Sequence, residues 1–238
     1  MILVHYMKLS IIIPVFNEIR TIKKLILKVL NQEIRSLQII VVDDFSTDGT
    51  RELIKSELSQ YIHKTIYHDK NMGKGAAIRS AQSFIEGDIV LIQDADLEYD
   101  PNDYKQLIDP IIKKKSNVVY GSRVKGINRY RSNNFISYYR IFFNHMLTIL
   151  TNLLNNQNLT DAHTCYKVFD SKLFKQIKLI EDDFAFCPEI TSKISKKNIK
   201  ITEVKITYQG RSVKEGKKIG IYDGFRAVYV LLKNKFFS

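Results

Sequence analysis

Cysteine is scarce in this chain, which has only Cys165 and Cys187 among its 238 residues. Two cysteines this far apart make neither a disulfide framework nor a cysteine-rich zinc site, and they fit a reducing cytosol. Long hydrophobic runs are also missing: no stretch reaches 18 clean apolar residues, so we expect no membrane-spanning helix. The first six residues are too short for a secretory signal and are expected to be an upstream start or a short arm.

Two glycine-rich phosphate-binding fingerprints are absent as well. Residues 71–75, Asn-Met-Gly-Lys-Gly, lack the spacing of an ATPase P-loop, and no Gly-x-Gly-x-x-Gly follows the first expected strand. The chain is therefore expected to be neither a P-loop ATPase nor a Rossmann dehydrogenase. Lys74 still lies where it could approach a nucleotide, although a solvated lysine in a turn is an equally good interpretation.

Basic charge is concentrated in one half of the chain. Residues 1–112 carry 13 Lys or Arg against 16 Asp or Glu, whereas residues 113–238 carry 24 against 9. A basic half indicates a nucleic acid, an anionic membrane surface or a phosphorylated substrate as partner, or else a generally solubilising surface. Charge alone does not choose among these.

Apolar runs and helical periods alternate along the first half at the spacing of βαβ units. Strands are expected at 9–15, 38–42, 64–67, 88–92 and 117–120, and helices at 19–30, 51–58, 76–85 and 104–114. This alternation predicts an α/β fold with a mainly parallel, mixed sheet flanked by helices.

The second half is less regular. Helices are expected at 135–154, 173–177, 188–196 and 222–237, strands at 166–169 and 199–208, and a basic loop at 210–220. No internal repeat or low-complexity linker divides the chain. We therefore expect residues 1–238 to form a single domain with two functional halves, about 7–123 and about 124–238.

Carboxylate pairs follow two of the expected strands. Asp94 and Asp96 come directly after the apolar run 89–92, and Asp43 and Asp44 end an earlier strand. Ligands of open α/β sheets bind beyond the carboxyl ends of the strands. Hard carboxylate oxygens there suit Mg²⁺ or Mn²⁺, which hold a substrate diphosphate. For an isolated pair, the ordinary alternative is an acidic turn that faces solvent and precedes a helix.

The end of the first expected strand indicates a nucleoside pocket. Pro14 restricts the backbone there, Phe16 could flank a base, and Glu18 could accept a hydrogen bond from a base or ribose. An ordinary strand exit capped by Asn17 is the alternative. Together with Asp44 on the neighbouring strand, these residues predict nucleoside binding at the same edge of the sheet.

Five motifs occur in order over residues 13–123. They read Ile-Pro-x-Phe-Asn-Glu, Val-Asp-Asp-x-Ser-x-Asp-Gly-Thr, Asn-x-Gly-Lys-Gly, Asp-Ala-Asp-Leu-Glu and Tyr-Gly-Ser-Arg. This order resembles the family 2 glycosyltransferases of the GT-A fold, most closely the dolichyl-phosphate mannose synthase-like, or polyprenyl-phosphate glycosyltransferase, branch. Segments at 159–161, 166–169, 186–189 and 211–218 extend the resemblance over nearly the whole chain.

The resemblance implies roles for individual residues. The positions that bind the nucleotide-sugar correspond to Pro14, Phe16, Glu18, Asp44, Lys74, Asp94, Ala95 and Asp96. The expected metal ligands are Asp94 and Asp96, together with Glu98, which stands where the family often has a Gln ligand. Arg123 and Arg140 match acceptor-phosphate positions, and Arg211 and Lys217 match a loop that closes over the diphosphate. The serine that usually ends this loop is missing. Asp94, Asp96, Arg211 and Lys217 are the expected catalytic residues.

The implied reaction is a single displacement with inversion that depends on Mg²⁺ or Mn²⁺. It moves a hexose from GDP-mannose or UDP-glucose to a polyprenyl phosphate at the cytoplasmic face of a membrane. The expected helix at 135–154 is then either a core helix or an amphipathic helix in the membrane interface. Contact with the membrane would be peripheral.

Three alternatives to this reaction stand beside it. The first is a family 2 transferase that uses a polysaccharide or another non-lipid acceptor, and the second is an inactive relative. The third, a non-enzymatic nucleic-acid-binding protein, leaves the strand-end carboxylates unexplained, so no nucleic-acid partner is expected.

Overall fold

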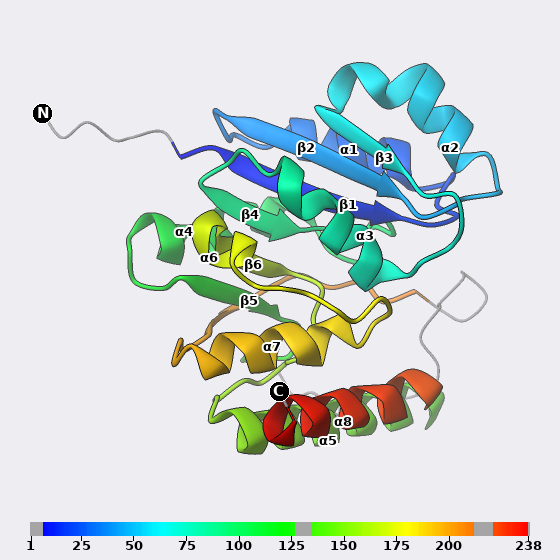
Figure 1. Cartoon of the computed structure of the whole chain (residues 1–238). Coiled ribbons are helices and arrows are strands. Elements are labelled where there is room, and N and C mark those ends of the chain that lie inside the picture. Colours follow the sequence, from blue (N-terminus) through cyan, green and yellow to red (C-terminus); the bar gives the residue numbers. More distant parts are fainter. Residues whose placement is uncertain (1–6, 127–134, 212–220, 238) are drawn as a thin grey trace, which may run out of the picture.

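A mixed β-sheet forms the centre of the fold (Figure 1). The computed structural model describes residues 7–126, 135–211 and 221–237. The seven strands lie in the order β3-β2-β1-β4-β6-β5-β7. They are β1 (Leu9–Val15), β2 (Leu37–Asp43), β3 (Lys64–Tyr67), β4 (Ile89–Ile92), β5 (Val118–Ser122), β6 (Lys167–Asp170) and β7 (Thr202–Lys205). Neighbours pair in parallel except that β6 is antiparallel to both β4 and β5. The predicted mainly parallel sheet is confirmed.

Helices lie on both faces of this sheet. They are α1 (Ile22–Leu30), α2 (Thr50–Leu53), α3 (Lys74–Ala81), α4 (Tyr104–Ile112), α5 (Phe135–Asn155), α6 (Ser171–Lys175), α7 (Phe186–Lys196) and α8 (Ile221–Phe236). In α1 the buried residues Ile22, Leu25, Ile26 and Val29 recur at helical spacing, so one stripe faces the core. Short π-helical and 3₁₀ turns, Ile54–Leu58 and Ser59–Tyr61, extend α2.

The central strands are buried on both faces. All residues of β4 are buried, and β1 and β2 are apolar along nearly their whole length. A sheet covered by helices on both sides requires such continuous apolar runs. Because β1, β2, β3 and β4 run parallel, their carboxyl ends lie along the same edge of the sheet.

A second helical layer lies beyond α7, where α5 and α8 pack side by side (Figure 1). Both helices expose large apolar side chains on their outer faces, including Phe143 and Leu153 on α5 and Phe225 on α8. Of the two alternatives predicted for residues 135–154, a core helix describes only the face of α5 that buries Thr148 and Thr151, and the membrane-interface alternative stays a prediction. Across the described residues, no helix combines the length and apolarity that crossing a membrane requires.

Candidate active site at the carboxyl ends of the strands

Buried hydrogen bonds of Gln93 hold the start of the turn after β4. Gln93 accepts hydrogen bonds from the hydroxyls of Tyr104 and Tyr166, each at 2.7 Å, and its backbone N–H donates to the carbonyl of Ile12. Beyond it, Leu97 adopts a left-handed backbone with φ of 63°. The resulting tight turn presents Asp94 and Asp96 at the carboxyl end of the strand, as the sequence predicts, with the buried Ala95 between them.

Lys74 at the start of α3 is the direct partner of Asp94, forming an ion pair with its carboxylate. Burial on its own would lower the pKa of Lys74, but Asp94 and the nearby thiols of Cys165 and Cys187 raise it well above its ordinary value. The lysine is therefore protonated at neutral pH. The contact of Lys74 in this structure is with the carboxylate of Asp94, and its predicted role at the nucleotide stays a prediction.

Asp96 is largely buried beside two other acidic side chains. Burial, followed by repulsion from Asp94 and Glu98, raises the pKa of Asp96 to about 7. Protein ligands alone do not complete a metal site, since no three His, Cys, Asp or Glu side chains group suitably in the part of the chain that the structure describes. Magnesium sites commonly use one or two carboxylates together with substrate phosphates. Asp94 and Asp96 fit a metal of that kind.

Glu98 lies next to these acids, but its carboxylate accepts hydrogen bonds from other parts of the protein. Its carboxylate accepts hydrogen bonds from the Tyr208 hydroxyl at 2.8 Å and from the Arg211 backbone N–H at 2.6 Å. These contacts attach the segment after β7 to the turn after β4. The metal-binding role of Glu98 stays a prediction.

Arg211 connects the end of β1 with the same turn. Its guanidinium donates to both carboxylate oxygens of Glu18, at 2.8 and 3.2 Å, and to the backbone carbonyl of Asp96. The residues predicted for nucleoside and diphosphate binding thus lie together. Lys217, the other predicted catalytic cation, lies outside the described residues.

Asp44 organises the turn at 71–75. Its carboxylate accepts hydrogen bonds from the backbone N–H groups of Met72 and Gly73 at 2.8 and 2.7 Å, and lies 2.7 Å from the Nδ1 of His68. The predicted nucleoside role of Asp44 stays a prediction, because its carboxylate supports the loop that carries Lys74. His68 was not anticipated, since nothing in its local sequence marks it as a partner of Asp44.

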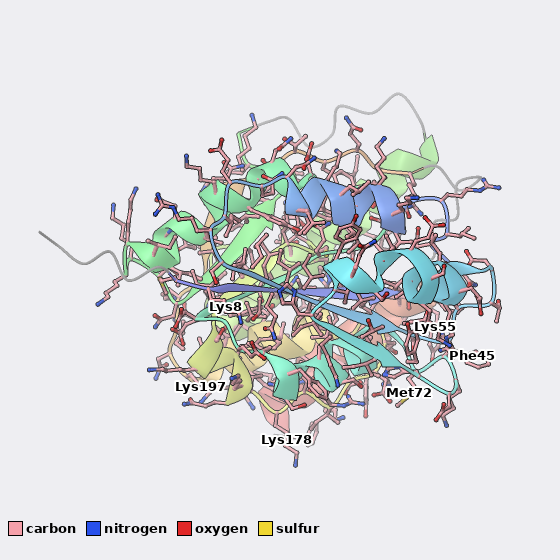
Figure 2. The ribbon with its side chains drawn as sticks, turned by 90° about the horizontal axis from the view of Figure 1, so that it is seen from above. Lys8, Phe45, Lys55, Met72, Lys178 and Lys197 are labelled. Atoms are coloured by element: carbon pink, nitrogen blue, oxygen red, sulfur yellow. The ribbon has the colours of Figure 1, made fainter. Side chains whose placement is uncertain are left out.

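The apolar candidates lie at the same edge. Pro14 and Phe16 are half-buried at the end of β1. Figure 2 shows Phe45 and Met72 toward one end of the molecule, away from Lys8, which immediately precedes β1. Both side chains are substantially exposed. They offer apolar surface beside the predicted nucleoside pocket, although the sequence predicted a role for neither side chain.

Arg123 forms a buried, two-pronged ion pair with Asp161. Both distances are 2.7 Å, and the guanidinium also lies 5.2 Å from the centre of the Tyr208 ring. Burial would raise the pKa of Asp161, but Arg123 lowers it overall. Because Tyr208 also donates to Glu98, the predicted acceptor-phosphate residue lies one side chain away from the turn after β4. Arg140 lies in the first part of α5, residues 135–140, of which only the backbone is described.

Comparison with known proteins shows the family of this chain. The profile described as "Glycosyl transferase family 2" matches residues 10–178, most of the chain. The chain belongs to glycosyl transferase family 2. The five ordered motifs are thereby confirmed as those of a glycosyltransferase, and the non-enzymatic interpretation is set aside.

Two curated relatives match almost the whole chain. The UDP-N-acetylglucosamine–dolichyl-phosphate N-acetylglucosaminyltransferase of Methanococcus voltae is 29% identical over 94% of this chain and 95% of its own length. The dolichol-phosphate mannosyltransferase of Pyrococcus furiosus is 29% identical over 95% of this chain. The chain spans 64% of that second relative, less than two thirds of its length.

A solved structure shares the fold of this glycosyltransferase. Glucosyl-3-phosphoglycerate synthase from Mycobacterium tuberculosis, in complex with Mn²⁺, UDP and glucosyl-3-phosphoglycerate, superposes with a TM-score of 0.73. The identity is 16%, and the match covers 96% of this chain and 80% of the synthase. The predicted GT-A fold is confirmed.

Proposed function

We propose that this family 2 glycosyltransferase moves a hexose from a nucleotide-sugar to a polyprenyl phosphate and depends on Mg²⁺ or Mn²⁺. The observation that carries the proposal is the juxtaposition of the acidic turn at Asp94 and Asp96 with Arg211 and, through Tyr208, with Arg123. A donor diphosphate and an acceptor phosphate need such adjacent acidic and basic groups. The relatives named for dolichyl-phosphate acceptors support the acceptor class.

The donor site supplies charge stabilisation for the leaving group. A divalent ion held by Asp94 and Asp96, with Glu98 nearby, would neutralise the negative charge that develops on the departing diphosphate. Arg211 already lies at this turn, so its guanidinium supports the same charge without rearranging solvent. Glu18 and Asp44 then orient the nucleoside.

The acceptor needs alignment rather than strong activation. A phosphate monoester has a second pKa of about 6, so its oxygen is already anionic near neutral pH. Arg123, supported by Asp161, orients this oxygen against the anomeric carbon, and proximity supplies most of the rate enhancement. A single attack from the side opposite the diphosphate inverts the anomeric centre.

The layer of α5 and α8 is the surface that we assign to peripheral membrane contact on the cytoplasmic side. Its exposed apolar side chains are Phe142, Phe143, Met146, Ile149 and Leu153 on α5, and Tyr222, Phe225, Tyr229, Leu232 and Phe236 on α8, with Phe237 just after it. Lys235 is exposed near the end of α8. Aromatic and aliphatic side chains beside basic ones suit the interface of an anionic bilayer.

Radiolabelled sugar transfer into a lipid extract tests the reaction. The assay offers GDP-mannose, UDP-glucose and UDP-N-acetylglucosamine with a polyprenyl phosphate and Mn²⁺ or Mg²⁺. Lipid-soluble label from one donor is expected, and it should disappear with EDTA and in Asp96→Ala but persist in Asp109→Ala, a carboxylate in α4.

Label found only in water-soluble glycan would favour the non-lipid alternative. Donor hydrolysis without any lipid product, with the polyprenyl phosphate present, would contradict the lipid-phosphate acceptor. No turnover of any donor by the wild-type enzyme would contradict the proposed reaction itself.

A further inference from the structure

Lys74 is enclosed by side chains from the second half of the chain. Its side chain is only 12% exposed, and its Nζ lies 5.9 and 5.8 Å from the ring centres of Phe184 and Phe186. The two rings and the low exposure keep the Lys74 ammonium out of solvent and next to the Asp94 carboxylate. This environment differs from that of a solvated lysine in a phosphate-binding loop.

The turn that carries Lys74 packs closely against the backbone at residues 181–182. The N–H of Ala76 donates to the Asp182 carbonyl at 3.0 Å. A Cβ at Gly73 would lie 2.4 Å from that same oxygen, and a Cβ at Gly75 would lie 2.2 Å from the Glu181 carbonyl oxygen. Glycine at both positions permits this approach, because any side chain would collide with backbone atoms.

Helix α8 holds the same segment from the other side. Arg226 donates to Glu181 at 2.6 Å and to Asp183 at 3.1 Å, and Lys233 lies 3.2 Å from Glu181. Glu181 is buried, and its N–H donates to the carboxylate of Glu189 in α7. Residues 181–186 therefore contact α8, α7 and the Lys74 turn at once.

We propose that Lys74 is a positioning residue for Asp94, and that α8 sets this ion pair through residues 181–186 without touching substrate. The inference rests on the proposed function only in giving Asp94 a place in the donor site. In this proposal Lys74 orients the Asp94 carboxylate and does not bind the diphosphate directly. The second half of the chain then completes the donor site as well as the acceptor site.

The two roles of Lys74 predict different behaviour when its charge is removed. Without the ammonium, Asp94 adds unbalanced negative charge beside Asp96, so a free divalent cation binds more tightly while the carboxylate loses its orientation. A lysine that contacts the diphosphate would instead cost nucleotide affinity, seen as a rise of the donor KM with kcat unchanged. The split between kcat and KM therefore separates the two roles, and the binding of free cation tests the ion pair with Asp94.

Lys74→Met is the direct test, with Lys70→Met, an exposed lysine just before the turn, as the matched control. Mn²⁺ binding without nucleotide, followed by electron paramagnetic resonance, should tighten about three- to tenfold as one opposing charge is removed. In transfer assays kcat should fall at least about tenfold with the donor KM changed by less than about threefold. Lys70→Met should match the wild type in both readouts.

A rise of the donor KM with kcat unchanged would overturn the positioning role, as would unchanged or weaker Mn²⁺ binding. Lys74→Arg keeps the charge and should show Mn²⁺ affinity close to that of the wild type. If Lys74→Met does not fold, Lys74→Gln gives the same comparison of Mn²⁺ affinity and of kcat against KM.

Arg226→Ala tests the part played by α8, with Lys197→Ala, an exposed charge at the end of α7, as control. Arg226→Ala should tighten Mn²⁺ binding and lower kcat in the same directions as Lys74→Met, each by about two- to threefold, because it acts through residues 181–186. Wild-type values in Arg226→Ala would overturn the role of α8. If the wild type transfers no sugar, the proposed function fails, while the Mn²⁺ measurements still test whether Lys74 and residues 181–186 act on Asp94.

Discussion

The two halves of this glycosyltransferase meet at the turn after β4, and each contributes side chains there. The first half, residues 7–123, supplies carboxylates at the ends of buried strands, among them Glu18, Asp94 and Asp96. The second half supplies Arg211 and the segment that encloses Lys74. The first half is built from local βαβ units, whereas the second wraps around it through long-range contacts. Neither half contains all of the residues predicted for the site.

The largest effect is expected from breaking the proposed metal site after β4, in the first half. Asp96→Asn should lower the transfer rate at least about thousandfold, because the developing charge on the diphosphate loses its cation. Vesicle binding by α5 and α8 should stay at the wild-type level. Steady-state kinetics and vesicle co-sedimentation check both expectations, with Asp109→Asn as control. Retained activity would mean that the metal does not depend on this carboxylate.

Removal of Arg123 should damage stability as well as activity. Arg123→Met leaves Asp161 buried without its partner, which should cost about 3 kcal/mol of unfolding free energy. Urea denaturation measures this loss, and the double variant Arg123→Met/Asp161→Asn should recover part of it. A loss below about 0.5 kcal/mol would show that Asp161 is held by other groups.

Breaking the contact between the halves at Arg211 should mainly affect catalysis. Arg211→Ala is expected to lower kcat/KM about hundredfold, because it removes a charge-assisted donor from the diphosphate site. Glu18→Gln should cost less, and the double variant less than the two losses combined, since the side chains are paired. Fully additive losses would indicate that the pair does not act as a unit.

The pH dependence of Mn²⁺ binding tests the contribution of the acidic residues in the first half. With a pKa of about 7, Asp96 must lose a proton to bind a cation at lower pH. Mn²⁺ affinity should therefore rise about tenfold per pH unit up to pH 7 and level off above it. Because the folded state raises this pKa, the metal-free protein should lose stability as pH rises from about 4 to 7. Thermal melts of wild type and Asp96→Asn, without metal, test the second statement, and the variant should lack this loss.

The smallest effect is expected at the outer surface of the second half. Phe237→Ser should weaken binding to anionic vesicles about fivefold, because one exposed aromatic ring no longer enters the interface. Phe84→Ser, an exposed aromatic remote from α8, is the control. Equal binding by both variants would exclude the end of α8 from the membrane contact.

Local patterns predicted most of the elements correctly. The expected strand at 64–67 matches β3, and the expected helix at 222–237 overlaps all but one residue of α8. Buried strands and amphipathic helices leave a period that can be read within a few residues. The antiparallel direction of β6 was not predicted, because a strand's own residues do not encode which neighbours it joins.

By itself, the sequence determined the order of strands and helices, the family, and the carboxylates at the strand ends, since all of these depend on short-range spacing. Only the tertiary structure decided how the charges pair. Lys74 with Asp94, Glu18 with Arg211 and Arg123 with Asp161 join different elements, and the last two pairs are 193 and 38 residues apart. Any lysine or arginine can pair with any carboxylate, so the choice depends on which side chains the folded sheet brings together in a buried place.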